Sequence, residues 1–218
     1  TGPLLEGPAP RLYGVPPGAD FPRQVVEGLL ARTRGATPEA LARVELIVNT
    51  RRMQRRIAAM FDDGPARLLP RIRLLTDLGQ QVWPGIPPAV PPLRRRLQLT
   101  RLVGKLLDET PDLAPKSAVY DLADSLAALM DEMQGEGVPP EALRQLDVRD
   151  TSGHWQRSLA FVNLVEEFAG PDAAHPDPEA RQRRIVEALA RRWDNEPPDH
   201  PVILAGSTGS RGATLLLM

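Results

Sequence analysis

The sequence has no cysteine among its 218 residues, so structural disulfides and thiolate metal sites are excluded within it. It also lacks any apolar run long enough to cross a membrane, and its proline- and glycine-rich start does not resemble a signal peptide. We therefore expect a cytoplasmic protein with no membrane association. The net charge of −1 gives no overall attraction to a polyanion, so any nucleic-acid site must be a local feature.

Groups that commonly carry catalysis are also scarce. Lysine occurs only at Lys105 and Lys116, so a nucleotide loop near the start of the chain has no lysine to bind the β- and γ-phosphates. The three histidines lack metal-ligand spacing, and the amphipathic pattern of one expected helix explains its acidic side. We therefore predict neither a metal site nor a catalytic residue. The side chains considered are His154, His175, His200, Asp121, Asp124, Asp131 and Glu132.

The most informative stretch is residues 44–61, VELIVNTRRMQRRIAAMF. A short apolar run followed at once by a helical period predicts a buried strand that leads directly into an amphipathic helix. Either Asn49 or Thr50 can cap that helix. Four arginines fall on one side of the helix and an apolar stripe on the other. Helix-terminal N–H groups and guanidiniums beside the carboxyl end of a strand together suit a phosphate group.

Strand and helix patterns alternate through the first 83 residues, and a strand pattern returns near the end of the chain. This alternation predicts an α/β fold with a parallel sheet covered by helices. Strands are expected at residues 11–15, 44–48, 68–75 and 201–205, and helices at residues 21–34, 51–61 and 76–82.

A proline-rich linker at residues 83–92 separates this alternation from a long stretch of helical period. We predict an α/β domain formed by residues 1–83 and 198–218, with an inserted all-helical subdomain at residues 84–197. Because the chain stops within an apolar helical pattern, we also expect it to be the N-terminal piece of a longer protein. The helices expected inside the insertion cover residues 93–109, 118–134, 139–146, 152–169 and 178–193.

Two glycine-containing loops are candidates for phosphate binding. Residues 14–20 follow the first expected strand, where a mononucleotide loop belongs, but they lack the Gly-Lys-Ser/Thr sequence, and a plain strand–turn–helix corner is the alternative. Residues 206–212, GSTGSRG, match neither common phosphate motif and form either an anion nest or a tight turn. The degenerate ATP-loop position is Gly14 and Gly18, and the candidate anion nest is Gly206, Ser207, Thr208 and Gly209.

Arginine is concentrated in three stretches. Those at residues 94–96 and 181–192 are typical of solvated helix faces. The cluster at residues 51–56 differs because it follows the carboxyl end of a strand, where α/β proteins bind ligands. We predict DNA contacts there, through Asn49, Thr50, Arg51, Arg52 and Arg55.

Several runs of the sequence are particular enough to suggest a family: LYGVPPGADFP, VELIVNTRRMQRR, RLLPRIRLLTDLG, YDLADSLAALMDEMQGEGVPPEAL, SGHWQRSLAFV and VILAGSTGSRGAT. Over nearly the whole chain they resemble the N-terminal region of the AddB family of double-strand break repair proteins, alphaproteobacterial type. The resemblance implies a RecA-like α/β domain, like domain 1A of a superfamily 1 helicase, with an inserted helical subdomain like 1B. It also implies AddA, a helicase–nuclease subunit, as the protein partner and DNA as the nucleic acid.

By position in the family, residues 14–20 would occupy the ATP-loop place and residues 49–52 the DNA-contacting segment. Ala205 and Gly206 fall near where an active helicase keeps acidic residues for Mg²⁺ and water. The resemblance places the iron–sulfur cluster and Mg²⁺ of the nuclease in a C-terminal part beyond this chain, so we expect no cofactor here. We expect a catalytically degenerate module that binds DNA single strands or duplex ends and serves as a scaffold for AddA. The alternatives are an active P-loop ATPase and a pure protein–protein docking module that uses residues 93–194.

Overall fold

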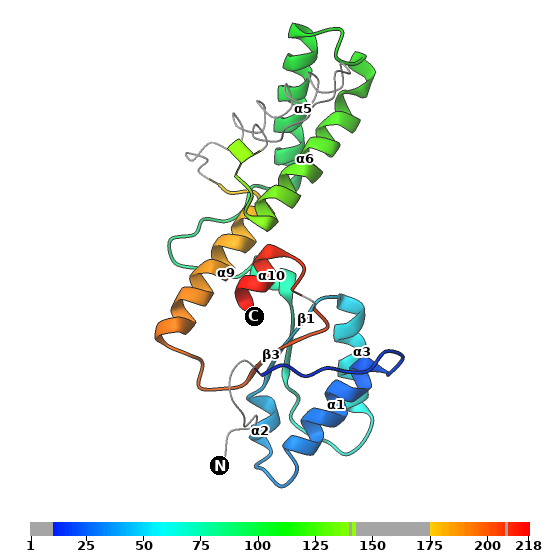
Figure 1. Ribbon diagram of the computed structural model, residues 1–218, viewed down its shortest axis with the longest axis vertical. Helices are drawn as coiled ribbons and strands as arrows, with labels where there is room; N and C mark the ends of the chain where they lie inside the picture. Colours follow the sequence, from blue (N-terminus) through cyan, green and yellow to red (C-terminus); the bar gives the residue numbers. More distant parts are fainter. Residues whose placement is uncertain (1–10, 140, 143–174, 208) are drawn as a thin grey trace. The chain divides into compact units, whose positions relative to one another are not determined.

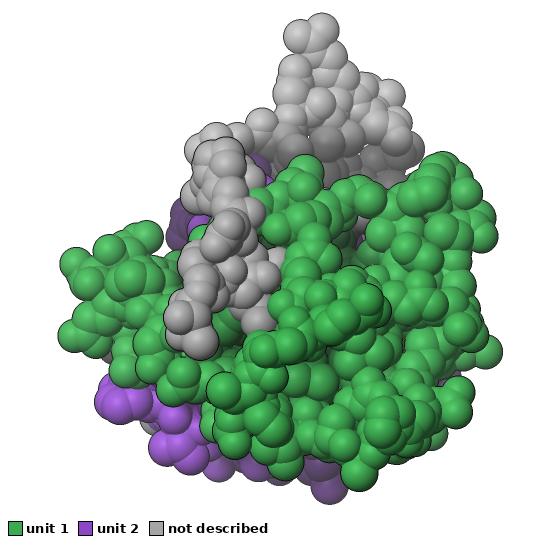
Figure 2. All heavy atoms as spheres, turned by 90° about the horizontal axis from the view of Figure 1, so that it is seen from below, with its two compact units in different colours: residues 1–78, 189–210, 218 green, residues 79–188, 211–217 purple. Residues whose placement is uncertain are grey.

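The computed structural model describes residues 11–139, 141–142, 175–207 and 209–218. It is an α/β structure with a three-stranded, all-parallel sheet flanked by helices, together with a helical region (Figure 1). The chain divides into two compact units (Figure 2). One contains residues 1–78, 189–210 and 218, and the other contains residues 79–188 and 211–217.

The first unit contains the sheet, whose strand order is β2-β1-β3. The central strand pairs in parallel with both neighbours, so that Leu46 lies opposite Ile72 on one side and Ile203 on the other. Three of its four residues are buried, which explains why its sequence is almost continuously apolar. The strands are β1 Glu45–Val48, β2 Arg71–Leu74 and β3 Val202–Ala205.

Helices cover one face of this sheet. α1 packs against α3, and apolar side chains of both helices join alternate strand residues in one core. Full burial of Ile57 and Phe61 on α3 contributes about 1.5–3 kcal/mol each. The unit's helices are α1 Phe21–Arg32, α2 Glu39–Ala42, α3 Arg51–Asp62 and α4 Leu75–Leu78. Its buried core is Val26, Leu29, Leu41, Val44, Leu46, Val48, Ile57, Phe61, Leu74 and Ala205.

The second unit is helical. α5 and α6 pack along each other around a separate apolar core, and α10 contacts α6. α9 contributes residues to both units. The elements are α5 Pro92–Glu109, the 3₁₀ turn η1 Lys116–Ala118, α6 Val119–Glu136, α9 Pro178–Asn195 and α10 Gly212–Leu217. The buried residues of this core are Leu99, Val103, Leu107, Leu113, Ala123, Leu126, Met130 and Met133.

The predicted strand at residues 11–15 is wrong. These residues form no strand, and Leu12 and Tyr13 are exposed, so the apolar letters of this segment do not enter the core. The third strand is shorter than predicted and begins at Arg71, directly after Pro70, which has no N–H for a strand ladder. The helix expected at residues 76–82 ends at Leu78, and Val82 is exposed.

The prediction that arginines 94–96 and 181–192 line solvated helix faces is wrong at two positions. Arg95 and Arg181 are buried among polar partners in the helical unit. On α5, Leu93 and Leu97 are exposed and lie outside the apolar core. The helix predicted at residues 152–169 and most of the one at residues 139–146 lie outside the described residues. No helix of the described part is both long and apolar enough to cross a membrane.

Candidate nucleic-acid interface

The loop between β1 and α3 forms the first part of the candidate site. Thr50 has extended backbone angles, and its Oγ1 accepts a hydrogen bond of 3.2 Å from the N–H of Met53. The cap predicted for Asn49 or Thr50 is therefore made by Thr50. The first N–H groups of an α-helix have no partner within the helix, and together with the helix dipole they favour a negative group at this end.

The arginine face of α3, defined as Arg51, Arg52, Arg55 and Arg56, lies opposite the buried side of the helix. All four side chains are exposed. Arg56 is held by Asp20, whose Oδ2 lies 2.6 Å from its Nη2, and it is still 54% exposed. Within the described residues, no carboxylate pairs with the other three arginines. Three guanidiniums are thus available to an external anion beside the carboxyl end of the central strand.

This concentration of charge has a cost for the helix. Residues three and four positions apart are neighbours on a helix surface, so Arg51, Arg52, Arg55 and Arg56 repel one another across successive turns. Each like-charge pair destabilises an isolated helix by about 0.2–0.5 kcal/mol. Only Asp20 offsets this repulsion among the described carboxylates. An anion bound on this face would relieve it.

The loop after β3 lies against the same corner. Val48 and Ala205 are opposite each other in the sheet, so the residues that follow them leave from neighbouring strand ends. The side-chain amide of Asn49 donates a hydrogen bond of 2.5 Å to the carbonyl oxygen of Gly206. Gly206 has a φ of 77°, and a Cβ at this position would lie 2.8 Å from Cε of Met53. The left-handed backbone angle favours glycine there, and any larger residue would also have to displace the end of the Met53 side chain.

The candidate anion nest is only partly described. Gly209 has a φ of 66°, and its N–H donates a 3.3 Å hydrogen bond to Oγ of Ser207. Thr208 lies outside the described residues. The assignment of Gly206, Ser207, Thr208 and Gly209 to anion binding therefore stays a prediction, with the Gly209 amide already engaged inside the loop.

The degenerate ATP-loop position also stays a prediction. Gly14 and Gly18 precede α1, and Gly18 has a φ of 83° within a turn closed by the Ala19 N–H and the Pro16 carbonyl. No strand leads into this turn, so the strand–loop–helix geometry that defines a phosphate loop is missing from the described residues. Asp20, at its end, caps α1 by accepting from the Arg23 N–H.

A charged cluster at the opposite end of the strands was not predicted. Glu45, the first residue of β1, lies 3.4 Å from Arg73 and 3.5 Å from the Nε2 atom of His200. The other ring nitrogen of His200 contacts Asp199 at 3.0 Å, and this hydrogen bond is the main reason that the pKa of Asp199 is lowered. The residues of this cluster come from three separate stretches of the chain, so no local sequence pattern predicts it. The described part of the chain contains no group of acidic and histidine residues able to hold a metal ion.

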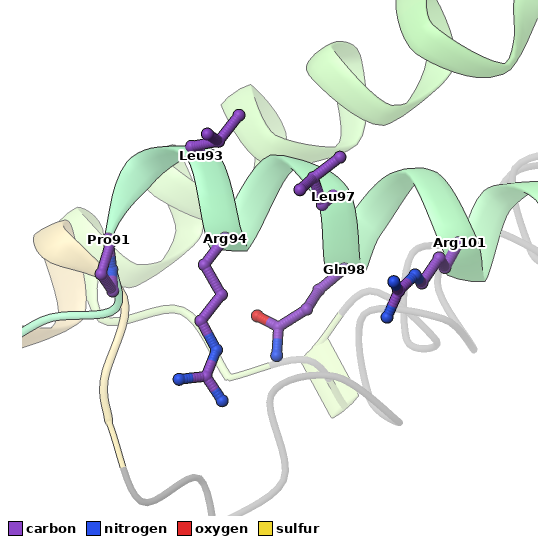
Figure 3. Close-up of a pocket in the computed structure, with 6 residues that line it drawn as sticks. All are labelled: Pro91, Leu93, Arg94, Leu97, Gln98 and Arg101. Atoms are coloured by element: carbon purple, nitrogen blue, oxygen red, sulfur yellow. The ribbon is translucent and has the colours of Figure 1, made fainter.

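The helical unit has an open hollow of about 480 Å³ along α5. Leu93 and Leu97 project from one side of the helix, whereas Arg94, Gln98 and Arg101 project from the other (Figure 3). The surface of the hollow is mainly apolar even though arginine and glutamine side chains border it, and the hollow belongs to a different unit from the arginine face.

Comparison with known proteins gives no match: no protein-family model, curated protein or solved structure is significantly similar to this chain. The geometry of the site and the sequence runs quoted above therefore carry the functional conclusion.

Proposed function

We propose that this chain is a helicase-like DNA-binding and scaffolding module that does not hydrolyse ATP, acting as the N-terminal region of an AddB-type subunit in double-strand break repair. The observation that carries the proposal is the arginine face of α3. Its three exposed guanidiniums lack described carboxylate partners, and they stand at the carboxyl end of the central strand of a parallel sheet.

In this proposal, DNA is held through its phosphates. Arg51, Arg52 and Arg55 lie on two successive turns of one exposed helix face and make charge-assisted contacts along the strand. The capped start of α3 favours a further phosphate oxygen near Thr50. None of these groups reads base edges, so binding has little sequence preference and depends steeply on salt.

ATP hydrolysis is not part of the proposed function. The segment at Gly14–Asp20 has no lysine and no hydroxyl of the Gly-Lys-Ser/Thr type, and the described residues directly before it form no strand. In the RecA-like arrangement that we propose, the carboxyl end of β3 contributes Ala205 and Gly206 instead of acidic residues. The described α/β unit therefore serves as a rigid support for the arginine face.

Protein docking is the second candidate function, and the surface of α5 favours it. Leu93 and Leu97 are 69% and 49% exposed and lie one turn apart, so together they present apolar surface. Arg94 and Arg101 flank them along the hollow. The sequence resemblance implies an AddA-type subunit as the partner, and we propose that it docks on this surface.

A salt titration tests the proposed function. The affinity of the chain for a fluorescent 20-nucleotide oligo-dT is measured by anisotropy between 50 and 300 mM salt, alongside a phosphate-release assay with ATP. We expect log K to fall with log salt by about 0.7 for each phosphate contacted, and no ATP hydrolysis above background. Absence of binding at the lowest salt would contradict the DNA-binding proposal, and DNA-stimulated phosphate release would favour the ATPase alternative.

A further inference from the structure

Asn49 is predicted to contact DNA, and the structure places its side chain in a hydrogen bond within the protein. Its Nδ2 lies 2.5 Å from the carbonyl oxygen of Gly206, a residue 157 positions away in the chain. This hydrogen bond joins the loop after β1 to the loop after β3, at the point where both strands end in register. The side chain is thus engaged within the protein beside the arginine face.

Gly206 lies close to Met53 in the first turn of α3. It follows β3 with a left-handed φ of 77°, and a Cβ there would lie 2.8 Å from Cε and 3.1 Å from Sδ of Met53. The same Met53 donates its backbone N–H to the capping Thr50. The loop after β3 therefore rests directly on the residue that closes the cap of α3.

From these two contacts we infer that Asn49 and Gly206 are positioning residues for the arginine face. Asn49 fastens the loop after β3, and Gly206 lets that loop sit against Met53. Together they fix the first turn of α3, from which Arg51 and Arg52 project. This inference rests on the proposed DNA-binding function and adds that Asn49 acts through Gly206 rather than on the DNA.

The chain offers a matched control. Asn195 also donates its side-chain amide to a backbone carbonyl, that of Arg191, at 2.8 Å, and it is exposed on α9. Asn195→Ala removes the same type of hydrogen bond from a different place. A positioning role predicts that only the Asn49 variant changes DNA affinity.

The experiment is a double-mutant cycle on the full chain, with oligo-dT affinity as the readout. We expect Asn49→Ala and Gly206→Ala each to weaken binding by three- to tenfold, with the salt slope unchanged because no cation is removed. The double variant is expected to bind as weakly as the single variant with the lower affinity, because both changes disrupt the same contact between the two loops. Effects that multiply in the double variant would overturn the inference, as would an unchanged affinity in Asn49→Ala.

Hydrogen exchange supplies a second readout that does not depend on Gly206→Ala folding. In Asn49→Ala, the amides of Ser207 and Gly209 exchange faster, while those of Asn195→Ala match the unmodified chain at these positions. Weaker DNA binding without faster exchange in this loop would show that Asn49 touches DNA directly, and would overturn the inference. Failure of the unmodified chain to bind oligo-dT would instead overturn the proposed function, and the positioning role would fall with it.

Discussion

Arg95 and Asp177 form an ion pair in the helical unit, with Nε of Arg95 3.0 Å from Oδ1 of Asp177 and side chains only 9% and 6% exposed. The Nε–H is not aligned on that oxygen, so the contact is an ion pair without a well-formed hydrogen bond. Arg95 also contacts Asp131 at 2.9 Å, and Gln134 donates to the second oxygen of Asp177. Burying a charge such as that of Arg95 is tolerated only when its partners compensate it, so removing one partner destabilises the fold.

Removing one member of this pair should therefore be costly. We expect Asp177→Ala to lower the free energy of unfolding by about 3 kcal/mol, because it leaves Arg95 buried without its most enclosed partner. Replacing both charges, as Arg95→Met with Asp177→Leu, recovers most of that loss. Urea unfolding followed by circular dichroism measures both effects.

Asp108 supplies the control for that comparison, because it pairs with Lys116 while both side chains remain more than half exposed. We expect Asp108→Ala to change the free energy of unfolding by less than about 1 kcal/mol. Equal losses for Asp108→Ala and Asp177→Ala would show that burial of the Arg95 pair has no energetic consequence.

Arg181 anchors the proline-rich connector to α9. It is buried, and its guanidinium donates to the carbonyl oxygens of Gly79, Gln81 and Pro87, the last two at 2.7 Å. We expect Arg181→Lys to lower the free energy of unfolding by about 2 kcal/mol, because an ammonium cannot reproduce the planar fork of donors. Limited proteolysis should then cut first within residues 79–90. Arg184→Ala, an exposed change on the same helix, is expected to stay within about 0.5 kcal/mol, and early cleavage in both variants would argue against the anchor.

The roles of these two arginines show where the sequence stops being informative. Arg95 and Arg181 lie in arginine-rich helical stretches that are typical of solvated faces. Their partners in the fold lie 32 to 102 residues away in the chain, such as Ala127, Asp177 and Gly79. A helical period records which side of a helix a residue is on, but it does not record what that side meets.

Glu179 should make the free energy of unfolding depend on pH. Burial is the main cause that raises its pKa, and Asp131 adds to it, while Arg211 and Arg95 act in the opposite direction. The folded state therefore binds this proton more tightly than the unfolded state, whose Glu pKa is about 4.3. The free energy of unfolding accordingly rises as the pH falls through the raised pKa towards that value. We expect Glu179→Gln to be more stable than the unmodified chain at neutral pH, and the difference to shrink on acidification.

Asp199 provides a control of opposite sign. The hydrogen bond from His200 lowers the pKa of Asp199, so its contribution to stability is present above the unfolded pKa of an aspartate and is lost as the pH falls through the lowered value. Asp199→Asn should then be less stable than the unmodified chain at neutral pH, with the difference disappearing in acid. Urea unfolding between pH 3 and 7.5 measures both variants. A neutral-pH loss of stability in Glu179→Gln would contradict the assignment.

Local patterns were sufficient for most of the α/β unit. The strand and helix within residues 44–61 were predicted because an apolar run, a capping residue and a helical period follow one another directly, and β1 and α3 confirm them. The parallel arrangement was also predicted, because short strands separated by helices have few other arrangements. The strand predicted at residues 11–15 is wrong because a strand also needs a neighbouring strand to pair with, and the pattern of five residues does not show whether such a partner exists.

In the candidate site, too, the sequence predicts some features, and others depend on the tertiary fold. The exposure of Arg51, Arg52 and Arg55 follows from the helical period alone, and the structure places all three on the open face of α3. The contact between Asn49 and Gly206 was not predicted, because it depends on β1 and β3 being neighbours in the sheet. The signal that was available is the shared position of both residues, each directly after a buried strand.

The most direct test of DNA binding by the arginine face compares two triple variants that remove the same charge. One is Arg51→Ala with Arg52→Ala and Arg55→Ala, and the other is Arg184→Ala with Arg191→Ala and Arg192→Ala on the exposed side of α9. Neither set is expected to reduce stability by more than about 1 kcal/mol, and the α3 set also relieves like-charge repulsion.

Oligo-dT affinity is then measured against salt for both variants and the unmodified chain. We predict that the α3 variant loses most of its affinity and that its salt slope falls by about 2, which corresponds to three lost phosphate contacts on a single strand. The α9 variant is predicted to keep the slope of the unmodified chain. Equal losses in the two variants, or an unchanged slope in the α3 variant, would contradict the claim that this face holds DNA.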